Sequence, residues 1–160
     1  MTEAMVGFLA DAEATERFAQ ALAAAAPAPA VVHLHGDLGA GKSTLARAWL
    51  RALGVRGAIR SPTYTLVERY PLGQGEALHL DLYRIGDGAE LEFLGLDDVQ
   101  AALWLVEWPE RGGASLPPAD LRISLAIDGA GRSCRLEARS PAGFAWLGRI
   151  APDQQLAPPS

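Results

Sequence analysis

The chain has 160 residues, a length that fits one domain of ordinary size and leaves no room for two full ones. Its composition, 49% hydrophobic and 21% charged, permits a buried core and excludes disorder throughout. The formal net charge of −5 argues against a domain that holds nucleic acid through its own phosphate contacts, and no apolar run approaches the ~20 residues that span a bilayer.

The first third of the chain predicts a helix, a strand, a glycine-rich turn and a second helix. Apolar residues at helical spacing predict a helix over 11–26, which Pro27 stops. The apolar, β-branched run 31–35 predicts a buried strand. The glycines of 36–41 predict a tight turn, and a helix is expected to follow over 43–53.

The remainder predicts mostly strands and defines the fold class. Strands are expected over 65–70, 77–83, 101–108, 121–127 and 133–138, with a short helix over 88–94. Turn-forming residues between the first two strands, and between the last two, predict hairpins. The glycine-rich turn between the first buried strand and its helix, GDLGAGKS at 36–43, is typical of a P-loop. We therefore expect an α/β fold with a P-loop NTPase-like mixed β-sheet flanked by helices, in a single domain over 1–150, followed by a flexible tail over 151–160.

The strongest functional signal is the segment GDLGAGKS at 36–43, which matches the phosphate-binding pattern G-x-x-x-x-G-K-[ST] without departure. Glycines allow backbone N–H groups to surround an anion, and the following helix adds its positive dipole end. Lys42, the only lysine of the chain, is placed to reach the β- and γ-phosphates, and Ser43 to bind Mg²⁺. The competing interpretation, a glycine turn needed only for folding, does not explain why the one lysine lies here.

Two carboxylates are candidates for the magnesium. A P-loop protein needs an acidic residue near the carboxyl end of a neighbouring strand. Asp81 ends the apolar run LHLD, and Glu107 ends the run LWLVE. Each could instead be a solvated strand end, and Asp81 could pair with Arg84. The pattern does not choose between the two, and both can serve.

Weaker signals surround these residues. The polar segment SPTYT at 61–65, with Thr63 and Thr65, lies where many P-loop proteins have a switch that senses the γ-phosphate, although a plain turn is equally compatible. The three histidines, His33, His35 and His79, alternate with apolar residues in predicted strands, so packed or surface histidines are favoured over metal ligands. With one lysine, the N-K-x-D guanine-recognition motif cannot occur, and no lid of a nucleotide kinase is evident.

Taken together, these segments resemble the TsaE family of bacterial tRNA threonylcarbamoyladenosine biosynthesis. The resembling pieces are GDLGAGKST at 36–44, SPTYTLVERY at 61–70, LHLDLYRI at 78–85, ELEFLGLDD at 90–98 and LVEWPER at 105–111. They stand in the order of the family and span roughly 11–139. Ser43 stands where the family more often has Thr, which retains the hydroxyl ligand.

The resemblance implies an ATPase that uses ATP and Mg²⁺ as an accessory subunit. In this family the ATPase supports formation of the threonylcarbamoyl group on N6 of adenosine 37, in tRNAs that read codons beginning with A. Its hydrolysis resets the TsaD–TsaB transferase and does not perform the transfer. The expected partners are therefore TsaD and TsaB, with tRNA contacted only indirectly and no membrane involved. Because the N-terminus is acidic, unlike a secretory signal, and Cys134 is the single cysteine, a cytoplasmic location is expected.

The resemblance also assigns individual residues. Lys42, Asp81 and Glu107 are the implied catalytic residues, and Ser43, Glu107 and Asp81 the implied metal ligands, with Glu107 favoured as the more direct one. The implied switch residues are Thr63 and Thr65. The implied ATP-binding residues are Thr15, Gly36, Asp37, Leu38, Gly39, Ala40, Gly41, Lys42, Ser43, Thr44, Trp108, Glu110, Arg111, Gly112, Gly113, Ala114 and Arg132.

Two other functions remain compatible with the sequence. The first is a nucleotide-dependent assembly factor, in which ATP binding drives docking and turnover is not essential. The second is a small-molecule kinase, which would transfer phosphate to a hydroxyl group and not to water.

Overall fold

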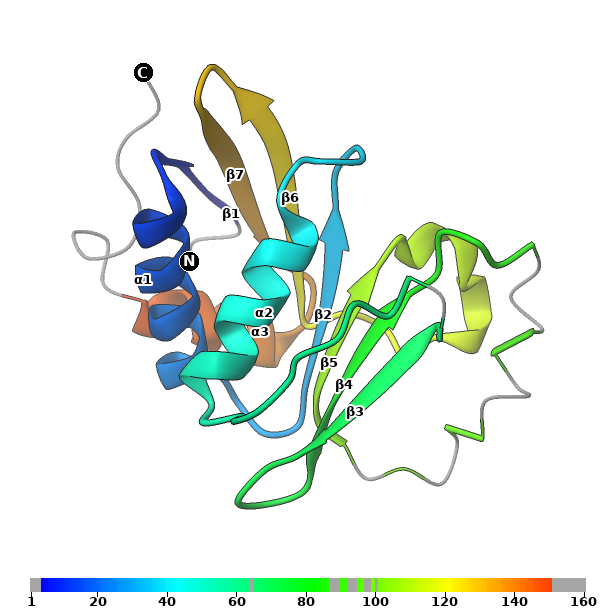
Figure 1. The fold of residues 1–160 in the computed structure, drawn as a ribbon. Helices are drawn as coiled ribbons and strands as arrows, with labels where there is room; N and C mark the ends of the chain where they lie inside the picture. Colours follow the sequence, from blue (N-terminus) through cyan, green and yellow to red (C-terminus); the bar gives the residue numbers. More distant parts are fainter. Residues whose placement is uncertain are drawn as a thin grey trace.

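The computed structural model of the chain describes residues 4–63, 65–86, 90–91, 95–96, 99 and 101–150. Seven strands form one mixed sheet, with helices packed on it (Figure 1). The strands are β1 (Ala4–Leu9), β2 (Ala30–His35), β3 (Val67–Pro71), β4 (Glu76–Asp81), β5 (Ala101–Glu107), β6 (Leu121–Asp128) and β7 (Gly131–Ala138). The helices are α1 (Ala12–Ala25), α2 (Lys42–Ala52) and α3 (Pro141–Arg149), with 3₁₀ turns η2 (Pro109–Arg111) and η3 (Gly113–Ser115).

The strand order is β1-β7-β6-β2-β5-β4-β3. The central strands β6, β2, β5 and β4 are parallel to one another, whereas β1 with β7, β7 with β6 and β3 with β4 pair antiparallel. Parallel strands point their carboxyl ends to one edge of the sheet, and binding sites in α/β folds lie at that edge. The predicted mixed α/β sheet is confirmed.

Local chemistry defines the helix ends. The Asp11 side chain accepts a hydrogen bond from the Ala14 amide at 2.8 Å, and this cap starts α1. The Ser140 side chain caps α3 in the same way, accepting from the Gly143 amide at 3.0 Å. The Ser140 hydroxyl also donates to Asp120, whose other oxygen accepts from the Val31 amide. These bonds tie the start of α3 to the central strand β2.

Two apolar cores lie on opposite faces of the sheet. The helix-side core packs the three helices on one face, and its large, fully buried side chains include Phe18, Leu22, Trp49, Leu50 and Trp146. The loop-side core covers β4 and β5 on the other face, with Leu78, Leu80, Leu82, Val106 and Leu116 among its members. Successive strand residues alternate between the faces, so Leu78 and Leu80 enter one core while His79 and Asp81 point toward α2.

The predicted elements are present with small shifts at their ends. The hairpin strands expected over 65–70 and 77–83 are β3 and β4, and the turn between β6 and β7 is only two residues long. Strand β1 and helix α3 were not predicted. Most of the expected helix over 88–94, and the whole tail 151–160, lie outside the described residues, so those predictions stay untested. No helix within the described part of the chain is both long and apolar enough to cross a membrane.

Candidate functional site

The glycine-rich loop joins the end of β2 to the start of α2. Gly36, Gly39 and Gly41 have positive φ angles of 146°, 81° and 108°, a backbone region that favours glycine. At Gly36, a Cβ would in addition collide with the carbonyl oxygen of Leu125 on β6. Gly41 occupies the cap position of α2. Because glycine has no side chain, the first amides of the helix receive no side-chain hydrogen bond from their cap. These N–H groups are available to an anion.

Lys42 is the first residue of α2 and is only 5% exposed. Its ammonium donates hydrogen bonds to the carbonyl oxygens of Gly36 and Asp37 in its own loop. It also lies 4.3 Å from the ring centroid of Trp108, within the range of a cation–π contact. Burial lowers the pKa of Lys42, against the opposing effect of nearby carboxylates. Loop carbonyls thus hold a partly desolvated cation where a phosphate would be a stronger partner.

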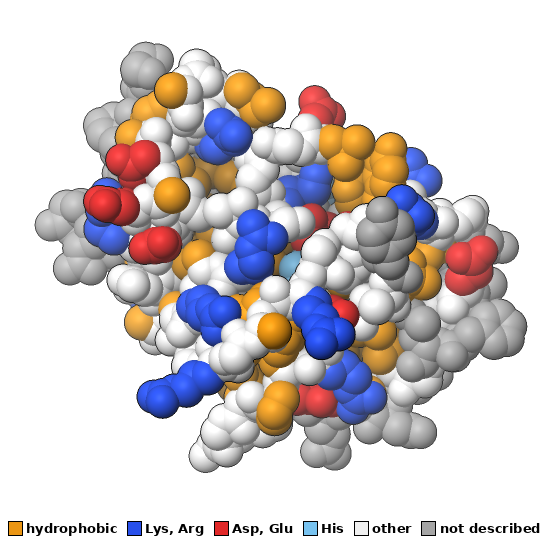
Figure 2. All heavy atoms as spheres, viewed as in Figure 1, with side chains coloured by type: hydrophobic (Ala, Val, Ile, Leu, Met, Phe, Trp, Pro, Cys, Tyr) orange, Lys and Arg blue, Asp and Glu red, His pale blue; other side chains and the backbone are white. Residues whose placement is uncertain are grey.

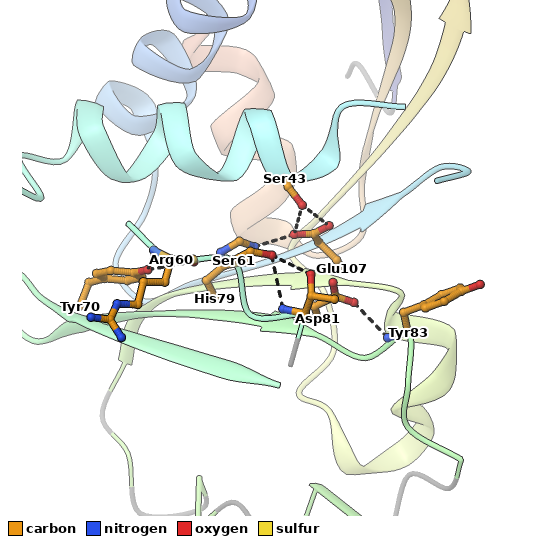
Figure 3. Close-up of polar contacts among 9 residues, drawn as sticks. Ser43, Arg60, Ser61, Tyr70, His79, Asp81, Tyr83 and Glu107 are labelled. Carbon is orange, nitrogen blue, oxygen red and sulfur yellow. Dashed lines mark hydrogen bonds and ion pairs between the residues drawn. The ribbon is translucent and has the colours of Figure 1, made fainter. Parts of the chain in front are cut away.

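Asp81 and Glu107 end the neighbouring parallel strands β4 and β5 and are paired in register. Both are buried, at 7% and 2% exposure. The Ser43 hydroxyl lies 3.0 Å from each oxygen of the Glu107 carboxylate. Asp81 accepts a hydrogen bond at 3.0 Å from the Tyr83 amide, and Figure 3 shows its carboxylate beside that of Glu107. Burial, with a contribution from the Glu107 charge, raises the pKa of Asp81.

The donor set formed by Ser43, Asp81 and Glu107 fits Mg²⁺, which prefers hard oxygen ligands. The described residues contain no cluster of three or more His, Cys, Asp or Glu able to enclose a metal by themselves. Magnesium characteristically binds through one or two carboxylates together with substrate phosphates and water. These three residues would therefore hold the ion only with a nucleotide.

His79 lies in the same buried polar cluster as Ser43, Asp81 and Glu107, and the sequence interpretation missed this position. Its Nε2 lies 2.6 Å from Oε2 of Glu107, and the two side chains are 1% and 3% exposed. The alternation of strand residues held the signal, since His79 stands two positions before Asp81 and must share its face. Figure 3 shows Ser43 and His79 converging on Glu107 from α2 and β4.

Two adjoining hollows are lined by residues of the phosphate loop. A cavity of about 340 Å³ over the phosphate loop contains both carboxylates. It is lined by Leu38, Gly39, Gly41, Lys42, Ser43, Thr44, Thr63, Asp81, Tyr83, Arg84, Glu107, Trp108 and Arg132. A second hollow of about 200 Å³ shares Gly41, Thr44 and Arg132 with the first and extends to Thr15 and the β6–β7 turn. Figure 2 shows Lys and Arg side chains along the middle of this face of the molecule. A larger groove of about 540 Å³ between α1 and α2 lies away from the carboxylates, although it shares Ala12, Thr15 and Thr44 with these hollows.

Arg132, predicted from the family resemblance alone, lies against the phosphate loop. Its guanidinium donates to the carbonyl oxygens of Ala40 at 3.1 Å and Gly39 at 3.3 Å. A residue from β7 thereby supports a loop that lies far from it in the sequence. Thr15, implied by the resemblance to bind ATP, lines the second hollow.

Other predicted residues are not brought into the phosphate cavity. Glu110 pairs with His35 at 3.3 Å, and both line a separate hollow outside the phosphate cavity. Ala114 lines another separate hollow, next to the loop-side core. The Arg111 guanidinium lies 5.1 Å from the Tyr83 ring centroid, at the rim of the site.

The remaining predicted residues divide in the same way. Gly112 lies between the two 3₁₀ turns, and Gly113 begins η3. Thr63 lines the cavity, whereas the exposed Thr65 hydroxyl donates to Glu68 at 3.1 Å. The nucleotide contacts predicted for 110–114 and the switch role of Thr63 and Thr65 stay predictions.

Comparisons with known proteins show the family and the fold to which this chain is similar. The family model described as "Threonylcarbamoyl adenosine biosynthesis protein TsaE" matches residues 9–134. The chain is 43% identical over 115 residues to the tRNA threonylcarbamoyladenosine biosynthesis protein TsaE of Haemophilus influenzae, covering 71% of this chain and 73% of that protein. It is 38% identical over 113 residues to the protein of the same name from Bacillus subtilis, covering 69% and 70%. The crystal structure of Bacillus subtilis YdiB is similar with a TM-score of 0.78 at 26% identity, over 94% of this chain and 95% of that one.

Proposed function

Because this chain belongs to the TsaE family of threonylcarbamoyl adenosine biosynthesis proteins, we propose that it is a P-loop ATPase. It acts in the biosynthesis of threonylcarbamoyladenosine in tRNA. Its binding and hydrolysis of ATP reset the TsaD–TsaB transferase between turnovers, and the transfer itself takes place on the partners. The free, buried Cys134 is compatible with the cytoplasmic location that this role requires.

The observation that carries the proposal is the position of Glu107. Its carboxylate accepts the Ser43 hydroxyl at 3.0 Å from the first turn of α2, directly after the phosphate loop. In a P-loop site, the hydroxyl of this residue and a strand-end carboxylate hold the magnesium that neutralises charge on the transferring phosphoryl group. A glycine turn needed only for folding does not account for a buried carboxylate paired with that hydroxyl.

The residues present suggest how the site acts. The Lys42 ammonium exchanges its loop carbonyls for phosphate oxygens and stabilises charge that develops on them. Ser43 and Glu107 would hold the magnesium. Either Asp81 or Glu107 would orient the attacking water, and the raised pKa of Asp81 favours a group that takes up a proton.

The charge of the chain supports a division of labour with partners. A net charge of −5 is unfavourable for holding tRNA directly, so the partners would supply that surface. Other P-loop proteins gain about 10³-fold or more in rate when a partner completes the site. We therefore expect slow hydrolysis by the isolated chain and strong stimulation by the TsaD–TsaB pair.

The test is phosphate release from ATP by the pure chain, with and without the TsaD–TsaB pair. Lys42→Ala removes the cation at the phosphates, and we expect it to lower the stimulated rate at least about 100-fold. Arg149→Ala is the matched loss of a cation far from the site, since Arg149 donates to the Ala25 carbonyl, and it should keep the full rate.

Each other outcome indicates a different function. Tight, ATP-dependent binding to the pair without stimulation would favour the assembly-factor function. Phosphate transfer to a hydroxyl metabolite would indicate a kinase. Normal turnover by Lys42→Ala would overturn the assignment of the phosphate loop.

A further inference from the structure

His79 makes one strong polar contact, and it makes it to Glu107. The 2.6 Å between Nε2 and Oε2 is short for a nitrogen–oxygen hydrogen bond, as expected when the acceptor is charged. Both side chains are almost completely buried, so water does not compete for the carboxylate from this side. The contact is therefore a fixed element of the site.

The other ring nitrogen of His79, Nδ1, adds no second polar contact within the described part of the chain. Nδ1 is buried and has no hydrogen-bond partner among the residues that the structure describes. With its proton on Nε2, the neutral ring donates to the carboxylate and leaves at Nδ1 an acceptor, which is the less costly group to leave unpaired. His33 contacts the Pro117 carbonyl and His35 pairs with Glu110, so neither shares this arrangement.

Two donors thus converge on one carboxylate. His79 approaches Glu107 along the sheet from β4, and Ser43 approaches it from α2. When the Ser43 hydroxyl donates its hydrogen bond to Glu107, the lone pairs of its oxygen remain free for a metal. This requires the carboxylate to stay in one orientation, and a carboxylate at the end of a flexible glutamate side chain does not do so unaided.

We propose that His79 is a positioning residue, whose Nε2–H holds the Glu107 carboxylate so that Glu107 and Ser43 face the magnesium of the bound nucleotide together. The inference rests on the proposed function, because it concerns the same site. Outer-shell partners of this kind are worth about 10–100-fold in metal affinity. His79 touches neither nucleotide nor metal and acts only through Glu107.

Two substitutions separate positioning from packing. In His79→Gln, the amide nitrogen reaches the place of Nε2 and can still donate to Glu107. In His79→Asn, the shorter amide reaches only the place of Nδ1. The matched controls are His33→Gln and His33→Asn, the same changes on β2 next to the Pro117 carbonyl.

The measurement is the affinity for a non-hydrolysable ATP analogue, by calorimetric titration with Mg²⁺ and with chelator. We expect His79→Asn to lose about 10-fold or more of the gain in affinity that Mg²⁺ provides, and to bind as the unaltered chain does in chelator. His79→Gln should retain that gain within about threefold. The two His33 variants should match the unaltered chain in both conditions.

A second readout needs no variant. In protein labelled with ¹⁵N-histidine, the buried imidazole should show the Nε2–H tautomer, and its signals should move when Mg²⁺ and the analogue are added together. The Nδ1–H tautomer would overturn the proposal even if neither His79 variant folds. So would an unchanged magnesium gain in folded His79→Asn, or equal losses in His79→Asn and His79→Gln.

Failure of the proposed function is distinguishable from these results. If the unaltered chain binds no nucleotide with Mg²⁺, the phosphate-site assignment falls and the role of His79 falls with it. If the unaltered chain binds normally and only the His79 pattern fails, the ATPase proposal stands and His79 is a packed core residue.

Discussion

The helix-side core and the cluster at the carboxyl ends of β4 and β5 are both buried, but they are built from opposite chemistry. In the core, Trp146 is fully buried, donates its indole N–H to the Leu22 carbonyl and meets Trp49 edge to face at 5.7 Å. In the cluster, the ionisable side chains of Lys42 and Glu107 are nearly as buried. Burial of apolar surface stabilises a fold, whereas burial of charge costs desolvation that ion pairing only partly offsets.

The contrast separates the residues that stabilise the fold from those that are kept for a function. A folding requirement alone would favour apolar side chains at 42, 81 and 107, because well-packed hydrophobic replacements of buried charges are often neutral or stabilising. Charged groups retained at such positions are characteristic of binding and catalytic sites. The two regions should therefore respond oppositely to substitution.

The largest expected effect comes from Trp146→Ala. Removing this ring leaves a cavity between α3 and the other helices, and we expect the free energy of unfolding to fall by about 3–5 kcal/mol. Urea unfolding measures the loss. Trp108→Ala, at the partly exposed rim of the site, should cost less than half as much. Equal losses in the two variants would break the distinction between core and site.

Glu107→Gln should have the opposite pattern, with a large loss of activity and little change in stability. The amide keeps the size of the carboxylate but loses its charge, so we expect partner-stimulated phosphate release to fall by about 10²–10³-fold. The free energy of unfolding should change by less than about 1 kcal/mol, because the buried charge is itself costly. Glu137→Gln, which removes a carboxylate from a surface cluster of arginines, is the control and should leave phosphate release unchanged.

The smallest effect concerns pH and Asp81. Because its pKa is raised in the folded chain, the folded state binds the Asp81 proton more tightly than the unfolded state. That contribution stabilises the fold below the unfolded pKa of about 4 and is lost as the pH rises through the folded value. Above that value the folded chain bears the cost of burying an ionised carboxylate, and Asp81→Asn removes this cost. The variant should therefore be more stable than the unaltered chain at pH 7, by at most about 1 kcal/mol, with no gain at pH 3.

Melting temperatures measured from pH 3 to pH 7 provide the comparison. Asp128→Asn, an exposed change at the end of β6, should follow the unaltered chain at every pH. An Asp81→Asn variant that is less stable at pH 7 would show that the carboxylate supports the fold, contrary to the distinction drawn above.

Much of this arrangement is predictable from the sequence because it depends on local signals. The phosphate loop and its flanking strand and helix follow from glycine spacing and apolar periodicity, and the structure has them within a residue or two. The six residues of β1 contain a glycine, and α3 contains two, so both fall below the length and propensity that periodicity can detect. Their positions depend on packing against distant segments.

The contacts that the site residues make were harder to predict from the sequence. No local pattern shows that Arg132 reaches the carbonyls of the phosphate loop, or that Glu110 turns to His35. Both contacts depend on which strands become neighbours. His79 was interpreted as a packed or surface histidine, and it is packed, but its partner Glu107 becomes visible only once β4 lies beside β5.

The pairing of β1 with β7 has a consequence for the order of synthesis. Among the described residues, β1 lies at an edge of the sheet and pairs with β7, the last of the seven strands along the chain. Ala4 lies opposite Glu137 and Leu9 opposite Arg132. Contacts so distant along the chain form late and slowly in folding. The hollow at Thr15 is lined by Leu9 from one of these strands and Arg132 from the other. A nascent chain therefore cannot complete this pocket until both of these strands have been made.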